Sequence, residues 1–174
     1  MLLVALVALA PLVLAEPLSD GDADYITRVM SNIEKYITWP AGNYEGSGQL
    51  LVITIIGSST VNAPLMKLSG QATPDGKRFK VREVELSDMP ANSHVLLVAD
   101  SNNAAVEKAL KLLKERGTLV VGAAEGFGRL GCMVNFAKSA GDGSKVGIEI
   151  NATSLKEGKF QVSPAFSKIA KVIE

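Results

Sequence analysis

The chain has 174 residues, 47% of them hydrophobic and 21% charged, and its 18 basic residues balance its 18 acidic ones. This length and apolar content predict one globular domain with a substantial core. The zero net charge, without a cluster of lysine and arginine interleaved with aromatic residues, argues against a nucleic-acid partner. A single cysteine excludes an internal disulfide, and one histidine with one cysteine argues against a zinc site.

Residues 1–15 form an uncharged apolar run that ends Val13-Leu14-Ala15. The run is too short to span a bilayer, and its small residues at the end fit a cleavage site. It therefore predicts a signal peptide over residues 1–15, followed by a linker over residues 16–23. No basic residue precedes the run, so an uncleaved anchor or another start site is the alternative.

A first helix is predicted after the linker. Asp20, Asp22 and Asp24 suit a helix amino terminus, and apolar residues follow at helical spacing: Ile26, Val29, Met30, Ile33 and Ile37. Pro40 ends the pattern, since the residue before proline disfavours helical geometry. Trp39 stands at this stop, where it is either a core anchor or a ligand-facing indole.

Strands and helices then alternate. After a loop over residues 42–48, the apolar run 50–57 predicts a central strand, and a short helix follows with Pro64 in its first turn and Leu65, Met66 and Leu68 inward. Ser58, between this strand and helix, either binds an anion or caps the helix. Further strands are predicted over 79–86, 94–99 and 118–122. A helix from Asn102 or Asn103 to Gly117 lies between the last two, and its packing side includes Leu110 and Leu112.

Gly126, Gly128 and Gly131 match the dinucleotide fingerprint G-x-G-x-x-G. That fingerprint needs a helix after the glycines, whose amino-terminal amides hold the pyrophosphate. Residues 132–136 read instead as a strand, which a turn over 139–144 joins to an antiparallel partner over 146–150. We therefore expect a glycine-rich loop that leads into a hairpin, and no nucleotide cofactor. Cys132 is expected to be a small buried hydrophobe rather than a reactive thiol.

The tail predicts a turn of helix at 153–157, a short strand at 160–163 and a last helix. Ser163 caps this helix, Pro164 opens it, and Phe166, Ile169, Ala170 and Ile173 are expected to face inward. The whole pattern predicts an α/β fold of three layers. A mainly parallel central sheet carries an antiparallel hairpin at one end and helices on both faces, in a single domain over residues 24–174.

Several segments, in this order, resemble the YfiR-like family of bacterial periplasmic regulatory proteins. The segments are Lys35-Tyr36-Ile37-Thr38-Trp39-Pro40, His94-Val95-Leu96-Leu97-Val98, Gly126-Phe127, Gly131-Cys132-Met133-Val134-Asn135-Phe136, Val146-Gly147-Ile148-Glu149-Ile150-Asn151, and Val162-Ser163 with the following helix. The resemblance covers residues 24 to 173. Cys132 stands where the family usually has a glycine, and disulfide-based behaviour of some members needs cysteine pairs that this chain lacks.

The resemblance implies a non-enzymatic periplasmic protein. Such a protein binds the periplasmic sensor domain of an inner-membrane diguanylate cyclase and so lowers cyclic-di-GMP signalling. An accessory protein of a sensor kinase, or a periplasmic small-molecule sensor, is the alternative. A homodimer is compatible with either. No cofactor or metal is expected.

The glycine-rich loop is the predicted partner-binding surface, through Glu125, Phe127, Arg129 and Leu130. Such a loop can hold apolar side chains outward, and arginine is enriched at binding hot spots. The alternative is that Phe127 and Leu130 fold back as lids on the end of the sheet.

A small enzyme is a less favoured reading. It would need Ser58, Asp100, Glu125, Arg129 and Asn135 to converge at the strand ends. Asn135 is otherwise expected to satisfy backbone groups as a structural anchor.

Overall fold

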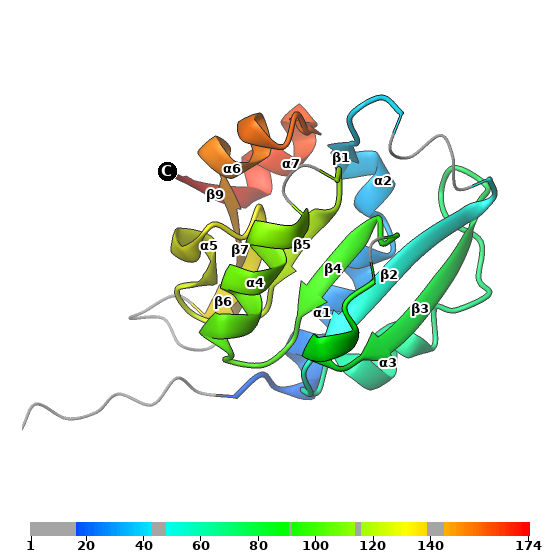
Figure 1. The fold of residues 1–174 in the computed structure, drawn as a ribbon, viewed down its shortest axis with the longest axis horizontal. Helices are drawn as coiled ribbons and strands as arrows, with labels where there is room; N and C mark the ends of the chain where they lie inside the picture. The colour runs from blue at the N-terminus through cyan, green and yellow to red at the C-terminus, as the bar shows by residue number, and fades with distance from the viewer. Residues whose placement is uncertain (1–16, 43–47, 91, 114–115, 139–144) are drawn as a thin grey trace, which may run out of the picture.

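The computed structural model describes residues 17–42, 48–90, 92–113, 116–138 and 145–174 (Figure 1). The predicted signal peptide, most of the predicted loop at 42–48 and the predicted turn at 139–144 lie outside the described residues.

The described residues form a seven-stranded sheet in the order β3-β2-β4-β5-β6-β7-β9. Every neighbouring pair is parallel except β6 and β7, which pair antiparallel with Val134 opposite Ile150. The strands are β2 (Leu50–Ile56), β3 (Arg78–Val84), β4 (Val95–Val98), β5 (Leu119–Gly122), β6 (Val134–Lys138), β7 (Val146–Asn151) and β9 (Ala170–Ile173). The mainly parallel α/β sheet and its hairpin are therefore confirmed.

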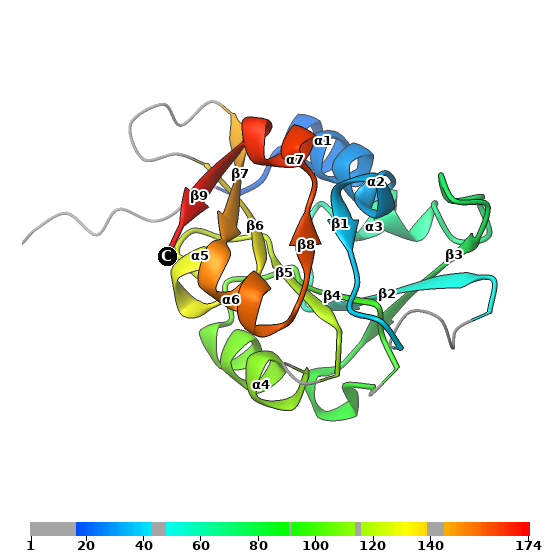
Figure 2. The same cartoon turned by 90° about the horizontal axis from the view of Figure 1, so that it is seen from above.

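Helices cover both faces of the sheet and complete three layers (Figure 2). One face carries α1 (Asp20–Met30), α2 (Ile33–Tyr36), α3 (Asn62–Met66) and α7 (Pro164–Ile169), and α4 (Asn103–Leu113) lies on the other. Successive residues of β4 alternate between the two apolar clusters. Val95 and Leu97 pack in the cluster with α1, and Leu96 and Val98 in the cluster with α4. Both clusters are buried, which explains the continuous apolar runs of the central strands.

The segment predicted as one helix forms two, α1 and α2. Helix α1 begins at Asp20, inside the predicted linker, where Ser19 and Asp22 form a capping box. It ends after Met30 because Ser31 Oγ and Asn32 Nδ2 each donate to the carbonyl of Arg28, and α2 then restarts the helix. The predicted apolar stripe is nevertheless buried throughout, since α2 continues along the same face.

A separate two-stranded sheet joins the two ends of the domain. In it β1 (Ile37–Thr38) pairs antiparallel with β8 (Gln161–Val162). α6 (Ala152–Glu157) precedes β8, and Asn151 caps it by accepting from Ser154 N. The predicted helical turn and short strand of the tail are thus present.

The last predicted helix is shorter than expected. Ser163 caps α7 and Pro164 opens it, but the helix ends at Ile169 and the chain continues as β9, parallel to β7 at the edge of the sheet. Phe166 is buried as predicted, whereas Ile169 is 55% exposed. The hairpin is therefore followed by one more strand and does not form the edge. A short apolar run fits helix and strand alike, which explains the error.

Two side chains expected to face inward are exposed. Met66 on α3 is 37% exposed and Leu112 on α4 is 43% exposed, while their neighbours Leu65 and Leu113 are buried. Each helix therefore buries a narrower face than predicted, in which Leu65 and Leu113 keep the core positions.

Candidate functional site

The glycine-rich loop contains one short helix, α5 (Phe127–Leu130), which the sequence did not predict. Gly126 before it and Gly131 after it have φ of 84° and 113°, left-handed values that favour glycine. The chain from Val134 onward is strand β6, as predicted, so α5 is a turn between two strands. It offers no long helix to hold a pyrophosphate.

Two asparagines of the hairpin hold this loop in place. Asn135 Nδ2 donates to the carbonyl of Ala124 at 3.0 Å and to Glu149 Oε2 at 3.0 Å. Asn151 Nδ2 donates to the carbonyl of Gly128 at 2.9 Å. Asn135 is fully buried, and its Oδ1 has no hydrogen-bond partner among the described residues. Asn135 thus anchors loop backbone, one of its two predicted roles.

The structure corrects the predicted outward position of Phe127. Its side chain is 1% exposed and packs in the cluster beneath α4. It lies on Gly122, where an added Cβ would come within 2.7 Å of the Cβ of Phe127. The tight turn at Gly126 directs Phe127 inward, so the alternative that it folds back as a lid holds for this residue. Leu130, in contrast, is 39% exposed and is not part of the core.

A groove lies between α5 and the strands β7 and β9, and we call it the α5–β9 groove. It has a volume of about 510 Å³, and its lining includes Glu125, Arg129, Glu149, Ile169 and Lys171. The exposed Ile169 gives it an apolar wall, and both signs of charge surround that wall. Two of the predicted partner-binding residues, Glu125 and Arg129, therefore line one groove. Sequence reasoning placed Ile169 in a helix but facing inward, and it missed Lys171 because β9 was read as helix.

A second hollow, the strand-end crevice, lies at the carboxyl ends of the parallel strands. Its volume is about 400 Å³, and its lining includes Ser58, Asp100, Glu125 and Lys138. The chain passes from β2 to β3 on one side and then to β4 on the other, and sheets of this kind bind ligands at such a point. The Asp100 carboxyl lies over Gly57, in the space that an added Cβ would occupy.

The strand-end crevice gathers only part of the predicted catalytic set. Ser58, Asp100 and Glu125 line it, while Arg129 lines the α5–β9 groove. Asn135 is buried beneath the loop. The only histidine of the chain, His94, precedes β4 and so lies at the amino-terminal ends of the strands, opposite the crevice. Ser58 therefore has no histidine beside it to act as a base.

Trp39 also lies at the amino-terminal ends of the strands, away from Ser58 and Asn135. It is 8% exposed, and its Nε1 donates to the carbonyl of His94 at 3.1 Å. Its ring meets Phe160 edge-on at 6.1 Å between centroids. These contacts are those of a core anchor.

His94 joins β2 to the segment that precedes β4. Its Nδ1 accepts a hydrogen bond from Val52 N at 2.8 Å, which requires an unprotonated Nδ1. Burial lowers the pKa of His94 below its usual value, and the charge of Lys77 lowers it further against the opposing effect of Glu34. The neutral ring is the form that the fold holds.

Cys132 is fully buried in the cluster with α4, as predicted. Burial raises the pKa of its thiol to about 12, so the thiol stays protonated at neutral pH and is a poor nucleophile.

Within the described ranges, no three histidine, cysteine, aspartate or glutamate side chains gather to hold a metal ion. Over the same residues, no helix is long and apolar enough to cross a membrane.

A family search matches residues 24–171 to DUF4154, described as YfiR/HmsC-like. The chain belongs to the YfiR/HmsC-like family. Members of this family are periplasmic regulatory proteins associated with the control of membrane diguanylate cyclases. The resemblance read from the sequence is therefore confirmed.

Two solved structures share the fold. One is a conserved domain protein from Vibrio cholerae O1 biovar El Tor, with a TM-score of 0.56 and 13% identity over 87% of this chain. The other is an ABC domain in complex with L-Trp from Streptococcus pneumoniae, with a TM-score of 0.52 and 11% identity over 88% of this chain. The chain spans 60% of the length of each. A search of curated proteins finds no match.

Proposed function

We propose that this YfiR/HmsC-like chain is a non-enzymatic periplasmic regulator. It binds the periplasmic sensor domain of an inner-membrane diguanylate cyclase through the α5–β9 groove and lowers cyclic-di-GMP synthesis. Family membership over residues 24–171 supports the class of function. The groove supports the location of the contact, because it combines an exposed apolar wall with charged side chains around it.

The residues of the groove suit a protein partner. Ile169, which lines the groove, is 55% exposed at the end of α7. Leu130 follows Arg129 on α5 and is 39% exposed, but it is outside the groove lining. Arg129 and Lys171 lie on opposite sides of the groove, one on α5 and one on β9. An apolar contact enclosed by a polar rim, with arginine beside it, is the usual composition of a binding hot spot.

The glycine-rich loop is fixed to the rest of the domain. Asn135 and Asn151 donate hydrogen bonds to its backbone, and the side chain of Phe127 packs in the core. A partner that binds Arg129 and Leu130 therefore meets a preformed surface, which reduces the entropy lost on binding.

Pull-down from membrane extracts tests the proposal. The bait is the domain without residues 1–15, and Ile169→Ser is compared with Leu112→Ser. Leu112 is a matched control because it is 43% exposed but lies on α4, outside the groove. We expect capture of a diguanylate cyclase, with affinity reduced about tenfold by Ile169→Ser and unchanged by Leu112→Ser. Equal binding by both variants would reject the groove, and capture of a histidine kinase instead would reject the cyclase.

Export is tested separately. Residues 1–23 fused to alkaline phosphatase, which is active only outside the cytoplasm, should give an active enzyme. An inactive fusion in intact cells would contradict the predicted signal peptide.

A further inference from the structure

The edge strand β3 carries a line of positive charge on the α4 side of the sheet. Phe79 and Val81 point to the other face, where they pack in the apolar cluster that contains α1. Because side chains alternate along a strand, Arg78, Lys80 and Arg82 point to the α4 side. Alternate residues of a strand are about 6.6 Å apart, so the three cations follow a line of about 13 Å. We call these three residues the β3 stripe.

The cations of the β3 stripe form no ion pair with the residues that the structure describes. Arg78 Nη1 donates to the carbonyl of Gly70 at 2.9 Å. Arg82 donates from Nε to Thr54 Oγ1 at 3.0 Å and from Nη2 to Asn92 Oδ1 at 2.8 Å. All three acceptors are neutral, and the lysine between the two arginines is exposed. These contacts position the stripe without balancing its charge.

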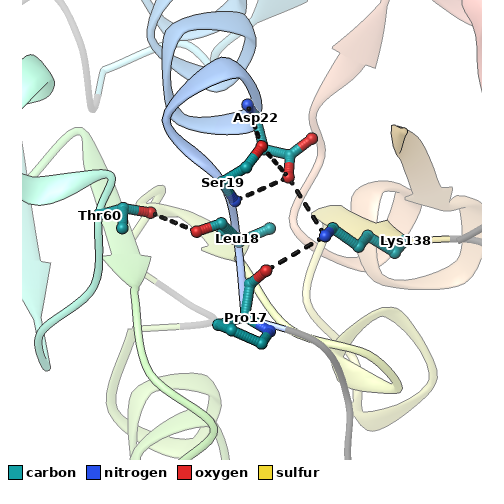
Figure 3. Close-up of polar contacts among 6 residues, drawn as sticks. All are labelled: Pro17, Leu18, Ser19, Asp22, Thr60 and Lys138. Atoms are coloured by element: carbon teal, nitrogen blue, oxygen red, sulfur yellow. Dashed lines mark hydrogen bonds and ion pairs between the residues drawn. The ribbon is translucent and has the colours of Figure 1, made fainter. Parts of the chain in front are cut away.

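Two lysines elsewhere in the fold, in contrast, are ion-paired. Lys138 at the end of β6 has its Nζ 3.5 Å from Asp22 Oδ2 and donates to the carbonyl of Pro17 at 3.1 Å (Figure 3). Lys77, immediately before β3, has its Nζ 3.1 Å from Glu34 Oε1. The fold therefore balances these two partly buried lysines internally and leaves the charge of the β3 stripe to an anion from outside.

The β3 stripe is accessible from the face of the sheet and not from its edge. The chain just before β3 closes the edge, since Gly70 N donates to the carbonyl of Phe79 at 2.8 Å and Phe79 N to that of Gln71 at 3.0 Å. A partner therefore cannot add a strand along this part of β3. On the face, Leu50 of β2 lies opposite Arg78 in register and is 37% exposed, so an apolar side chain borders the stripe.

Acidic residues limit the stripe at the carboxyl end of β3. Glu83, Glu85 and Asp88 line a hollow of about 630 Å³ there, together with Asp100. A membrane surface or a nucleic acid carries negative charge over a much wider area and would meet these carboxylates as well as the cations. A short acidic segment of a protein meets the cations alone, so the charge pattern favours this class of partner.

We propose that the β3 stripe is a docking site for a short acidic segment of a partner protein, whose carboxylates follow the line of cations while an apolar side chain contacts Leu50. The bonds of Arg82 to two neutral oxygens fix its guanidinium, whose planar shape matches a carboxylate. A single exposed ion pair contributes little, so several in line are needed. The stripe and the α5–β9 groove lie at opposite ends of the sheet, and neither proposal depends on the other.

A rhodamine-labelled peptide tests the site on the full chain by fluorescence anisotropy at low ionic strength. Its sequence is Leu-Glu-Thr-Glu-Thr-Glu, in which the glutamates alternate as the cations of the stripe do. We expect saturable binding of this peptide and no binding of the peptide with glutamine in place of glutamate. Salt should weaken the binding severalfold, because it screens exposed charges. Failure of the glutamate peptide to bind, or equal binding of both peptides, would overturn the proposal.

Reversal of one charge tests the location. Lys80→Glu changes an exposed side chain and should reduce the affinity of the glutamate peptide about tenfold, through one lost pair and one new repulsion. A peptide with lysine as its central charge should bind this variant better than the glutamate peptide does. Lys67→Glu is the matched control, because Lys67 is exposed at the end of α3 on the other face. Equal weakening by both variants, or no gain with the lysine peptide, would reduce the effect to net charge and reject the site.

Vesicles of phosphatidylglycerol distinguish a lipid surface from a protein segment. We expect the parent chain and Lys80→Glu to sediment equally with them, with the emission of Trp39 confirming that both chains are folded. Weaker sedimentation of Lys80→Glu would assign the β3 stripe to an anionic membrane and overturn the proposal.

Discussion

Replacing Phe127 and Leu130 singly by alanine separates core from surface within one turn of helix. Phe127 is 1% exposed and Leu130 is 39% exposed. Burying a phenylalanine removes roughly 150–200 Å² of apolar surface, which at about 25 cal/mol per Å² corresponds to about 4–5 kcal/mol. Measured Phe→Ala changes in cores cost about 3–5 kcal/mol. We expect Phe127→Ala to lower the free energy of unfolding by about 3–5 kcal/mol and Leu130→Ala by about 0.5 kcal/mol or less.

Urea denaturation followed by tryptophan fluorescence measures both changes. Trp39 is the only tryptophan, and it is buried on the opposite face of the sheet from Phe127, so its emission reports global unfolding. The dependence of the free energy on urea should be the same in all three chains, with only the midpoint shifted. A loss of several kcal/mol is a large share of a stability of about 5–15 kcal/mol, so Phe127→Ala needs measurement at low temperature.

Partner capture completes the comparison. Leu130→Ala should weaken capture without a change in stability, while Phe127→Ala should weaken it only as far as the fold is lost. A stability loss below about 1 kcal/mol for Phe127→Ala would refute the inward packing of the loop. A loss above about 2 kcal/mol for Leu130→Ala would refute the assignment of its side chain to the surface.

Three further changes test the packing that supports the site. Gly122→Ala should cost about 1–3 kcal/mol in urea titrations, because the added Cβ would come within 2.7 Å of Phe127 Cβ and neither backbone can yield easily. Trp39→Phe should cost about 1–2 kcal/mol by the same measurement, since it removes the hydrogen bond to the carbonyl of His94 and leaves a gap where the indole was. The pKa of His94 is lowered in the folded state, so below its ordinary value of 6.5 the unfolded chain takes up a proton that the folded chain does not. The free energy of unfolding should therefore fall as the pH drops from 6.5 through the folded pKa, and His94→Gln should flatten this part of the curve; an unchanged slope would contradict the neutral buried ring.

The central strands of this fold could be predicted because each is a short, continuous run of apolar residues. Residues 50–57 and 94–99 are apolar on both alternating sides, as a strand between two helical layers requires. The hairpin was predictable because the apolar segment after Cys132 is too short for a helix. The strand-end location of Ser58 and Asp100 follows from the same pattern, since parallel strands end at one edge.

The errors fall where a short segment fits two structures. Ala170 to Ile173 continues a helical spacing from Phe166, and only pairing with β7 selects the strand. The direction of Phe127 depends on the left-handed turn at Gly126 and on the space above Gly122. Such tertiary contacts are not visible in local spacing, so the α5–β9 groove could not be assembled from the sequence.

The two-stranded sheet of β1 and β8 can form only after nearly the whole chain is available, because it pairs residues near the two ends of the domain. Ile37 pairs with Val162, so the layer begun by α1 and α2 closes only when the carboxyl-terminal segment arrives. Contacts between such distant positions form slowly, because a long loop must be closed first. On the proposed export route, in which the chain passes through a narrow channel amino terminus first, this late closure would leave the domain unfolded until translocation is nearly finished.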